Sequence, residues 1–286
     1  MVLDNTCESC TIFREILFSL REGKKHLNMI EKIQDSGLNK EIKVENLSPG
    51  ASDGRSVDVQ MPALEMVQLN EAVTAVNVES LMPSDWQQKI GNVVKEYGKL
   101  VTLKGGAVST SMEPRTFTTV YIVVKGQDIE TNLPWLWRLY QGPFRELVSQ
   151  VAGREVEVDP DKKFSANINT ITKGTQKDGY ELHTDINHWT GLLAVTTMHE
   201  GDGGELIHVL PDGTRKETRI QAGLLYIFDG RNHPHKVNLL NPQGSSDTRI
   251  TLPMDYVFKG VRVERPKDME AIFGNGNERE GKIASP

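Results

Sequence analysis

Cysteine is scarce in this chain, whose 286 residues contain only Cys7 and Cys10, spaced as C-x-x-C. Two thiols cannot build the disulfide framework of a small secreted domain, and a structural zinc site needs four ligands. A thioredoxin-like redox pair would stand between a strand and a helix, whereas this pair stands at the start of the chain. We therefore interpret both residues as reduced thiols near a frayed terminus.

Long apolar runs and excess positive charge are also missing. No apolar run reaches the roughly 18–20 residues needed to cross a bilayer. The net charge is −6 and the pI is about 5.7, whereas a protein that binds nucleic acid or anionic membranes presents a basic face. The first residues lack the basic start, the apolar stretch and the cleavage site of a signal peptide. We expect a cytoplasmic protein that binds neither nucleic acid nor a membrane.

The first half of the chain has mainly helical periodicity. Apolar residues recur at helical spacing in 12–20, 27–33, 86–101 and 134–151, and "LSPGASDG" at 47–54 is typical of a surface loop. Ser84 and Gln87 resemble a capping box at the start of the third stretch, and Gly142-Pro143 interrupts the fourth. The apolar stripes predict helices that pack against a core.

The pattern changes at 116–125 and again from Phe164 onward. There the chain consists of short β-branched segments separated by Gly, Pro, Asp or Asn, and "PDG" at 211–213 predicts a hairpin turn. This order predicts a mainly β fold, a sandwich or jelly roll with helices packed on one sheet. We expect one domain over 1–265, with helical support and the first strands in 1–155 and the β core in 160–260. Residues 266–286 would form a tail or a lid.

One polar stretch, "GYELHTDINHW", places His183 two residues before Asp185. In an extended segment, residues two apart point the same way, so both side chains can reach one metal ion, while Thr184 would face away. The third ligand should be a histidine from another strand. His235 leads into the apolar segment 237–240 and is favoured, and His233 is its competitor.

The other three downstream histidines have a simpler interpretation. They are expected to be surface or loop residues, or interior residues with satisfied hydrogen bonds, and they are His188, His199 and His208.

Two histidines and one carboxylate leave part of the coordination sphere open. That pattern suits non-haem Fe(II) better than a fully ligated structural zinc. A 2-oxo acid can chelate such a metal through its keto and carboxylate oxygens, and its far carboxylate then needs a fixed cation. Arg249 and Thr251 alternate to one face of a predicted strand and offer a guanidinium fork beside a hydroxyl.

At this point the segment from Phe164 to Phe258 resembles the Fe(II)/2-oxoglutarate-dependent dioxygenases, in particular the prolyl-hydroxylase-like branch. The matched features, in chain order, are His183-Thr184-Asp185, Gly203-Gly204-Glu205-Leu206, "AGLLYIFDG" at 222–230, His235-Lys236-Val237 and Arg249-Ile250-Thr251.

The resemblance implies a double-stranded β-helix that uses Fe(II), 2-oxoglutarate and O₂ to oxidise an unactivated C–H bond, by hydroxylation or by desaturation or cyclisation. It also implies that Arg249 and Thr251 bind the distal carboxylate of 2-oxoglutarate, and that Tyr180 contacts this co-substrate. Halogenases of the family have a small residue in place of the metal-binding carboxylate, so Asp185 disfavours halogenation.

Substrate contacts are weaker predictions. Asn167 and Asn169 share one face of a predicted strand that we expect to point into the barrel, and Trp189 could wall the pocket. Arg231 and Arg115 are candidates for an anionic group, although a solvated loop charge is the favoured interpretation of each.

The leading hypothesis is an oxygenase of a small metabolite such as an amino acid. The alternatives are a prolyl or peptidyl hydroxylase and a non-catalytic metal-binding jelly-roll sensor. A peptide enzyme should have an open groove beside the metal. A sensor would not need a cation for a dicarboxylate.

Overall fold

The computed structural model describes residues 64–107, 109–113, 118–174 and 179–273. Two units are distinguished, Met1–Val59 and Gln60–Pro286, and every described residue belongs to the second. The expected helices at 12–20 and 27–33, the loop at 47–54 and both cysteines lie outside the described residues. Within those residues, no helix is long and apolar enough to span a bilayer.

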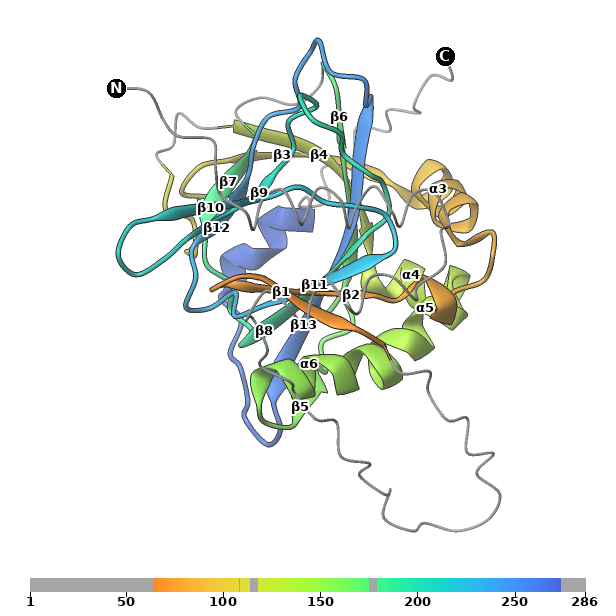
Figure 1. The fold of residues 1–286 in the computed structure, drawn as a ribbon, viewed down its shortest axis with the longest axis vertical. Coiled ribbons are helices and arrows are strands. Elements are labelled where there is room, and N and C mark those ends of the chain that lie inside the picture. Colours follow the sequence, from red (N-terminus) through yellow and green to blue (C-terminus); the bar gives the residue numbers. More distant parts are fainter. Residues whose placement is uncertain (1–63, 108, 114–117, 175–178, 274–286) are drawn as a thin grey trace, which may run out of the picture. The chain divides into compact units, whose positions relative to one another are not determined.

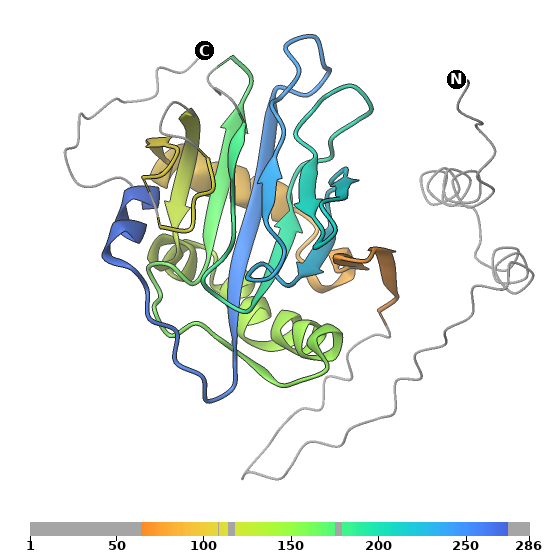
Figure 2. The same cartoon turned by 90° about the vertical axis from the view of Figure 1, so that its left-hand side faces the viewer.

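The larger of two antiparallel sheets has nine strands (Figures 1 and 2). Its main path runs β1 (Met66–Asn70), β2 (Val73–Asn77), β11 (Leu224–Phe228), β8 (Trp189–Ala194), β13 (Thr248–Phe258), β6 (Asn167–Thr172), β4 (Thr118–Lys125) and β3 (Lys99–Lys104), with β5 (Val156–Val158) paired to β13. The smaller sheet has the order β10 (Arg215–Thr218), β9 (Leu206–Val209), β12 (His235–Val237) and β7 (Tyr180–His183). The predicted mainly β jelly roll with supporting helices is confirmed.

Helices cover one face of the larger sheet (Figure 1). They are α3 (Trp86–Tyr97), α4 (Gly126–Asn132), α5 (Pro134–Leu139) and α6 (Arg145–Ala152), and a short 3-10 turn, η2, spans Glu79–Leu81. One apolar core joins these helices to the sheet, and a second core lies between the two sheets. Along β13, Leu252, Met254 and Tyr256 belong to the helix-side core, so the intervening residues face the smaller sheet.

Local structure differs from the prediction in three places. The helix predicted to extend to Val101 ends at Tyr97, because Gly98 leaves the helical conformation and Val101 is buried in β3. The capping box does not form: Asp85 is the N-cap residue, and the Gln87 side chain donates to the Val195 carbonyl. Gly142 and Pro143 do not break the chain of helices, since they form a π-helical turn, η3 (Tyr140–Phe144), between α5 and α6.

One local expectation corresponds directly to a structural feature. Residues 211–213 form the turn between β9 and β10, as predicted. The segment after Pro266 begins with a 3-10 helix, η4 (Lys267–Phe273), whose Met269 joins the core between the sheets. The Tyr121 hydroxyl donates to the Ile272 carbonyl at 2.6 Å, which ties η4 to β4.

Candidate metal centre

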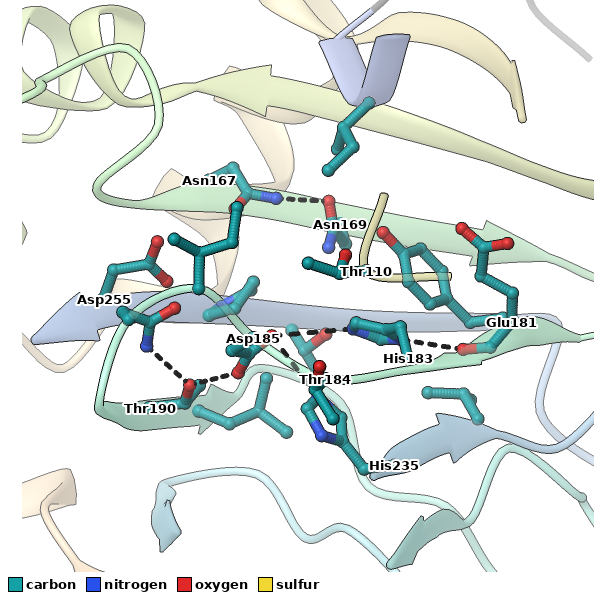
Figure 3. A pocket seen from close by; sticks show the side chains of 18 of the residues that line it. Thr110, Asn167, Asn169, Glu181, His183, Thr184, Asp185, Thr190, His235 and Asp255 are labelled. Carbon is teal, nitrogen blue, oxygen red and sulfur yellow. Dashed lines mark hydrogen bonds and ion pairs between the residues drawn. The ribbon is translucent and has the colours of Figure 1, made fainter. Parts of the chain in front are cut away.

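Three potential metal ligands converge between the sheets, and they come from two neighbouring strands and one loop. His183 is the last residue of β7 and is paired in register with His235, the first residue of β12. Asp185 lies in the loop after β7. Its Oδ1 is 3.6 Å from Nε2 of each histidine, and one ligand atom from each residue lies within 4.8 Å of the others (Figure 3).

Backbone contacts orient both imidazoles toward this point. Nδ1 of His183 is 2.7 Å from the Glu181 carbonyl, and Nδ1 of His235 is 3.0 Å from the His233 carbonyl. A carbonyl only accepts, so each Nδ1 carries the proton and each Nε2 offers a lone pair. Burial, and secondarily the neighbouring His235, lowers the pKa of His183 and favours the neutral ring that a metal requires.

A chain of side-chain hydrogen bonds holds the carboxylate. The Thr190 hydroxyl donates to Oδ2 of Asp185 at 2.5 Å, and the Asn187 amide donates to that hydroxyl at 3.0 Å (Figure 3). The Asp185 amide donates to the Gly230 carbonyl at 2.9 Å. A Cβ at Gly230 would overlap Oδ2 of Asp185, so only glycine admits this approach. Oδ2 is thus occupied, and Oδ1 is left for the metal.

Thr184 departs from the expectation, because it lines the cavity instead of facing away. Strand alternation stops at His183, where β7 ends, so the next two residues follow loop geometry.

A buried cation lies on β13 in the same cavity. Nε of Arg249 donates to the Gly204 carbonyl at 2.8 Å and NH1 donates to the Thr251 hydroxyl at 3.2 Å, whereas NH2 is buried without a partner. Burial lowers the pKa of Arg249 to about 10, which leaves it charged at neutral pH. A buried guanidinium nitrogen without an acceptor fits an anionic ligand group.

Glycine at position 204 makes room for this arginine. Its φ is +71°, and a Cβ there would lie 3.1 Å from Cδ of Arg249 and 2.9 Å from Leu240.

Other predicted residues also reach the cavity. Tyr180, Asn167 and Asn169 line it, and the Asn167 amide donates to Oδ1 of Asn169 at 2.6 Å. Burial, with the charge of Glu181 next, raises the pKa of Tyr180, so its phenol stays protonated.

Two candidate substrate contacts lie elsewhere. Trp189 packs against the helix-side core and is not among the residues that line this cavity. Arg231 is an exposed residue whose guanidinium donates to the Ile186 carbonyl and lies 3.3 Å from a ring nitrogen of His188. Arg115, the other candidate for an anionic substrate group, lies outside the described residues.

The other histidines in the described part of the chain do not join the three ligands. The backbone amide of His199 binds Asp202, and His188 stacks near Phe258. His208 is fully buried with no partner for either ring nitrogen, contrary to the expected satisfied interior residue, and burial lowers its pKa to about 2. His233 contributes its backbone carbonyl to His235 rather than its ring to the site.

Sequence reasoning missed several residues of the cavity wall. Thr190 and Asn187 orient Asp185, and Glu181 lies at the cavity with its carboxylate hydrogen-bonded to Ser111 at 2.6 Å. Asp255 and Arg265 line the cavity as an ion pair of 2.8 Å. Asp255 could have been found, because it continues the alternation of 249 and 251 along β13.

No family model and no curated protein matches this sequence. Solved structures match it by fold. An oxidoreductase of the 2OG-Fe(II) oxygenase family from Burkholderia pseudomallei is 12% identical with a TM-score of 0.50, over 68% of this chain and 89% of that chain. AviO1 from Streptomyces viridochromogenes Tue57 is 11% identical (TM-score 0.48; 68% and 93% covered). A prolyl-4-hydroxylase from Pseudomonas putida is 17% identical (TM-score 0.42; 66% and 93% covered). By its likeness to the Burkholderia structure, the chain has the fold of a 2-oxoglutarate- and Fe(II)-dependent oxygenase, the family that the sequence resembles.

Proposed function

We propose that this protein is an Fe(II)- and 2-oxoglutarate-dependent oxygenase that oxidises an unactivated C–H bond of a small metabolite. His183, Asp185 and His235 hold the iron, and Arg249 with Thr251 binds the distal carboxylate of 2-oxoglutarate. The observation that carries the proposal is the pairing, in one cavity, of three converging ligand atoms with a buried guanidinium nitrogen that has no acceptor.

The side chains have separate tasks. The imidazoles present Nε2 and Asp185 presents Oδ1, while Thr190 and the two backbone carbonyls fix their directions. Tyr180 lies beside His183, with ring centroids 5.3 Å apart, where it can contact the co-substrate. The bound iron, with 2-oxoglutarate and O₂, supplies oxidation of a C–H bond coupled to release of succinate and CO₂.

The cavity wall supports a metabolite as substrate more than a peptide. Met269 and Ile272 of η4 line the cavity, and the Tyr121 hydrogen bond holds that helix in place. A helix fixed in the cavity wall would narrow the open groove that a peptide needs. A metal-binding sensor is disfavoured, because a dicarboxylate partner such as Arg249 would have no role in it.

Anaerobic addition of Fe(II) and 2-oxoglutarate to the apoprotein tests the proposal. A weak visible charge-transfer band should appear in the wild type and should be lost in His183→Ala, Asp185→Ala and His235→Ala. If the wild type shows no band and consumes no 2-oxoglutarate with any candidate substrate, the enzymatic proposal is wrong.

A further inference from the structure

One face of β13 lines the cavity from Arg249 to Asp255. Arg249, Thr251, Pro253 and Asp255 alternate onto this face, and all four line the cavity. Arg249 and Asp255 are six residues apart, which corresponds to about 20 Å of strand. The cavity therefore has a cation at one end of β13 and a carboxylate at the other.

The metal ligands line the same cavity as these two ends. Asp255 is the register partner of Thr190, whose hydroxyl binds Asp185. In Figure 3, Asp255 and Asn167 lie on one side of Asp185, and His183 and Glu181 lie on the other. If the co-substrate extends from the metal toward Arg249, the Asp255 end is left for the substrate.

The charges at the Asp255 end do not balance. A single nitrogen, NH2 of Arg265, donates to Asp255 and to Asp159 at 2.8 Å each. Asp159 is 5% exposed, and the side chains of Arg265 and Asp255 are 10% and 16% exposed, so water compensates little of this charge. Two carboxylates share one guanidinium, so with both ionised this largely buried wall carries one negative charge more than its cation offsets.

The raised pKa of Asp255 agrees with this shortage of positive charge. Burial raises the pKa of Asp255 to about 7, although Arg265 opposes the shift. A carboxyl group in this state is short of positive charge, and a bound cation would favour its ionised form. The same cavity wall includes the amides of Asn167 and Asn169 and the apolar side chains of Phe164 and Met269.

We propose that Asp255 binds a protonated amine of the substrate and so selects metabolites that carry an ammonium group. Arg265 acts as a positioning residue that holds the Asp255 carboxylate toward the cavity. This inference rests on the proposed oxygenase function and narrows its substrate class. A charged amine at this end would hold the substrate in the same cavity as the metal ligands.

The test uses the full chain, loaded anaerobically with Fe(II) and 2-oxoglutarate, and follows the charge-transfer band. The probes are n-butylamine, putrescine and L-lysine, each compared with its fully N-acetylated counterpart. At least one ammonium probe should perturb the band saturably, and its acetylated counterpart should bind at least tenfold more weakly. Succinate release after admission of O₂ is the second readout.

Two variants localise the effect. Asp255→Asn should lose the preference for the ammonium form. Asp247→Asn, the same change at a side chain 87% exposed just before β13, should keep it. Circular dichroism and the melting temperature check that both variants fold. If Asp255→Asn does not fold, the comparison of free and acetylated probes on the wild type still tests selection for an ammonium group.

Three results would overturn the inference: no ammonium probe perturbs the band, free and acetylated probes bind equally, or a folded Asp255→Asn retains the preference. Because the charge-transfer band itself forms in each case, the oxygenase proposal would still stand. Absence of the band without any probe would instead refute the oxygenase proposal, and this inference with it.

Discussion

Thr190 holds the oxygen of Asp185 that faces away from the two histidines. Its hydroxyl donates to Oδ2 at 2.5 Å, while Oδ1 lies 3.6 Å from Nε2 of His183 and of His235. Thr190 is 3% exposed, and the Asn187 amide donates to the same hydroxyl. The hydroxyl hydrogen is therefore oriented toward Oδ2 of Asp185. The carboxylate thereby presents one oxygen to a metal before the metal arrives.

Thr190→Val is expected to weaken metal binding by about 10–100-fold, because it removes this hydrogen bond at nearly constant side-chain volume, while the Asn187 amide keeps only its bond to the Trp189 carbonyl. Co(II) titration monitored by visible absorption measures the affinity without turnover. Thr190→Ser should restore it. Equal affinities for the wild type and Thr190→Val would show that the hydroxyl does not position Asp185.

Gly230→Ala should abolish tight metal binding. The added methyl group would overlap Oδ2 of Asp185 and approach the Thr190 hydroxyl to 2.9 Å, so the carboxylate must move. The matched control is Gly91→Ala in α3, where nothing lies within 4 Å of the new Cβ. That change should leave metal binding intact and raise stability by up to about 1 kcal/mol. Isothermal titration with Co(II) and thermal unfolding separate the two results.

Arg249→Ala should weaken 2-oxoglutarate binding by at least about 100-fold, since it removes a buried cation whose NH2 has no acceptor within the protein. Metal affinity should change little, because Arg249 contacts Gly204 and Thr251 rather than the ligands. The charge-transfer band, titrated with 2-oxoglutarate, gives the first quantity, and Co(II) binding without 2-oxoglutarate gives the second. Arg215→Ala on exposed β10 is the control. Equal losses of metal and 2-oxoglutarate binding would contradict the assigned role.

The parts that could be predicted from the sequence are those encoded by short spacing. Alternation in "TRITLPMDYVF" placed Arg249 and Thr251 on one face, and the β-branched segments predicted the strands and the jelly roll. The turn at 211–213 is equally local. Each of these features depends on residues within one segment, where strand periodicity decides which way a side chain points.

The parts that could not be predicted depend on contacts between distant segments. Arg265 meets Asp159 across 106 residues, and no local pattern indicates that pairing. Gln87 resembles a capping residue in sequence, yet its side-chain amide donates to the carbonyl of Val195, 108 residues away. Thr184 was misplaced because the end of β7 is set by pairing with β12 and not by its own residues.

Asp255 makes the stability of the metal-free protein depend on pH in an unusual direction. Its pKa is about 7 in the folded chain, above the value near 3.9 expected for an unfolded chain, because burial outweighs the facing Arg265 and is reinforced by Asp185 and Asp159. Between these values the folded state binds more protons than the unfolded state, so the free energy of unfolding falls as the pH rises. Relative to Asp255→Asn, which cannot titrate, the wild type should lose at most about 4 kcal/mol between pH 4 and pH 7. Urea unfolding at several pH values in this range, without metal, measures the difference. A difference that stays constant or grows with pH would mean that Arg265 already neutralises Asp255 fully, and the carboxylate would then have no charge to offer a substrate amine.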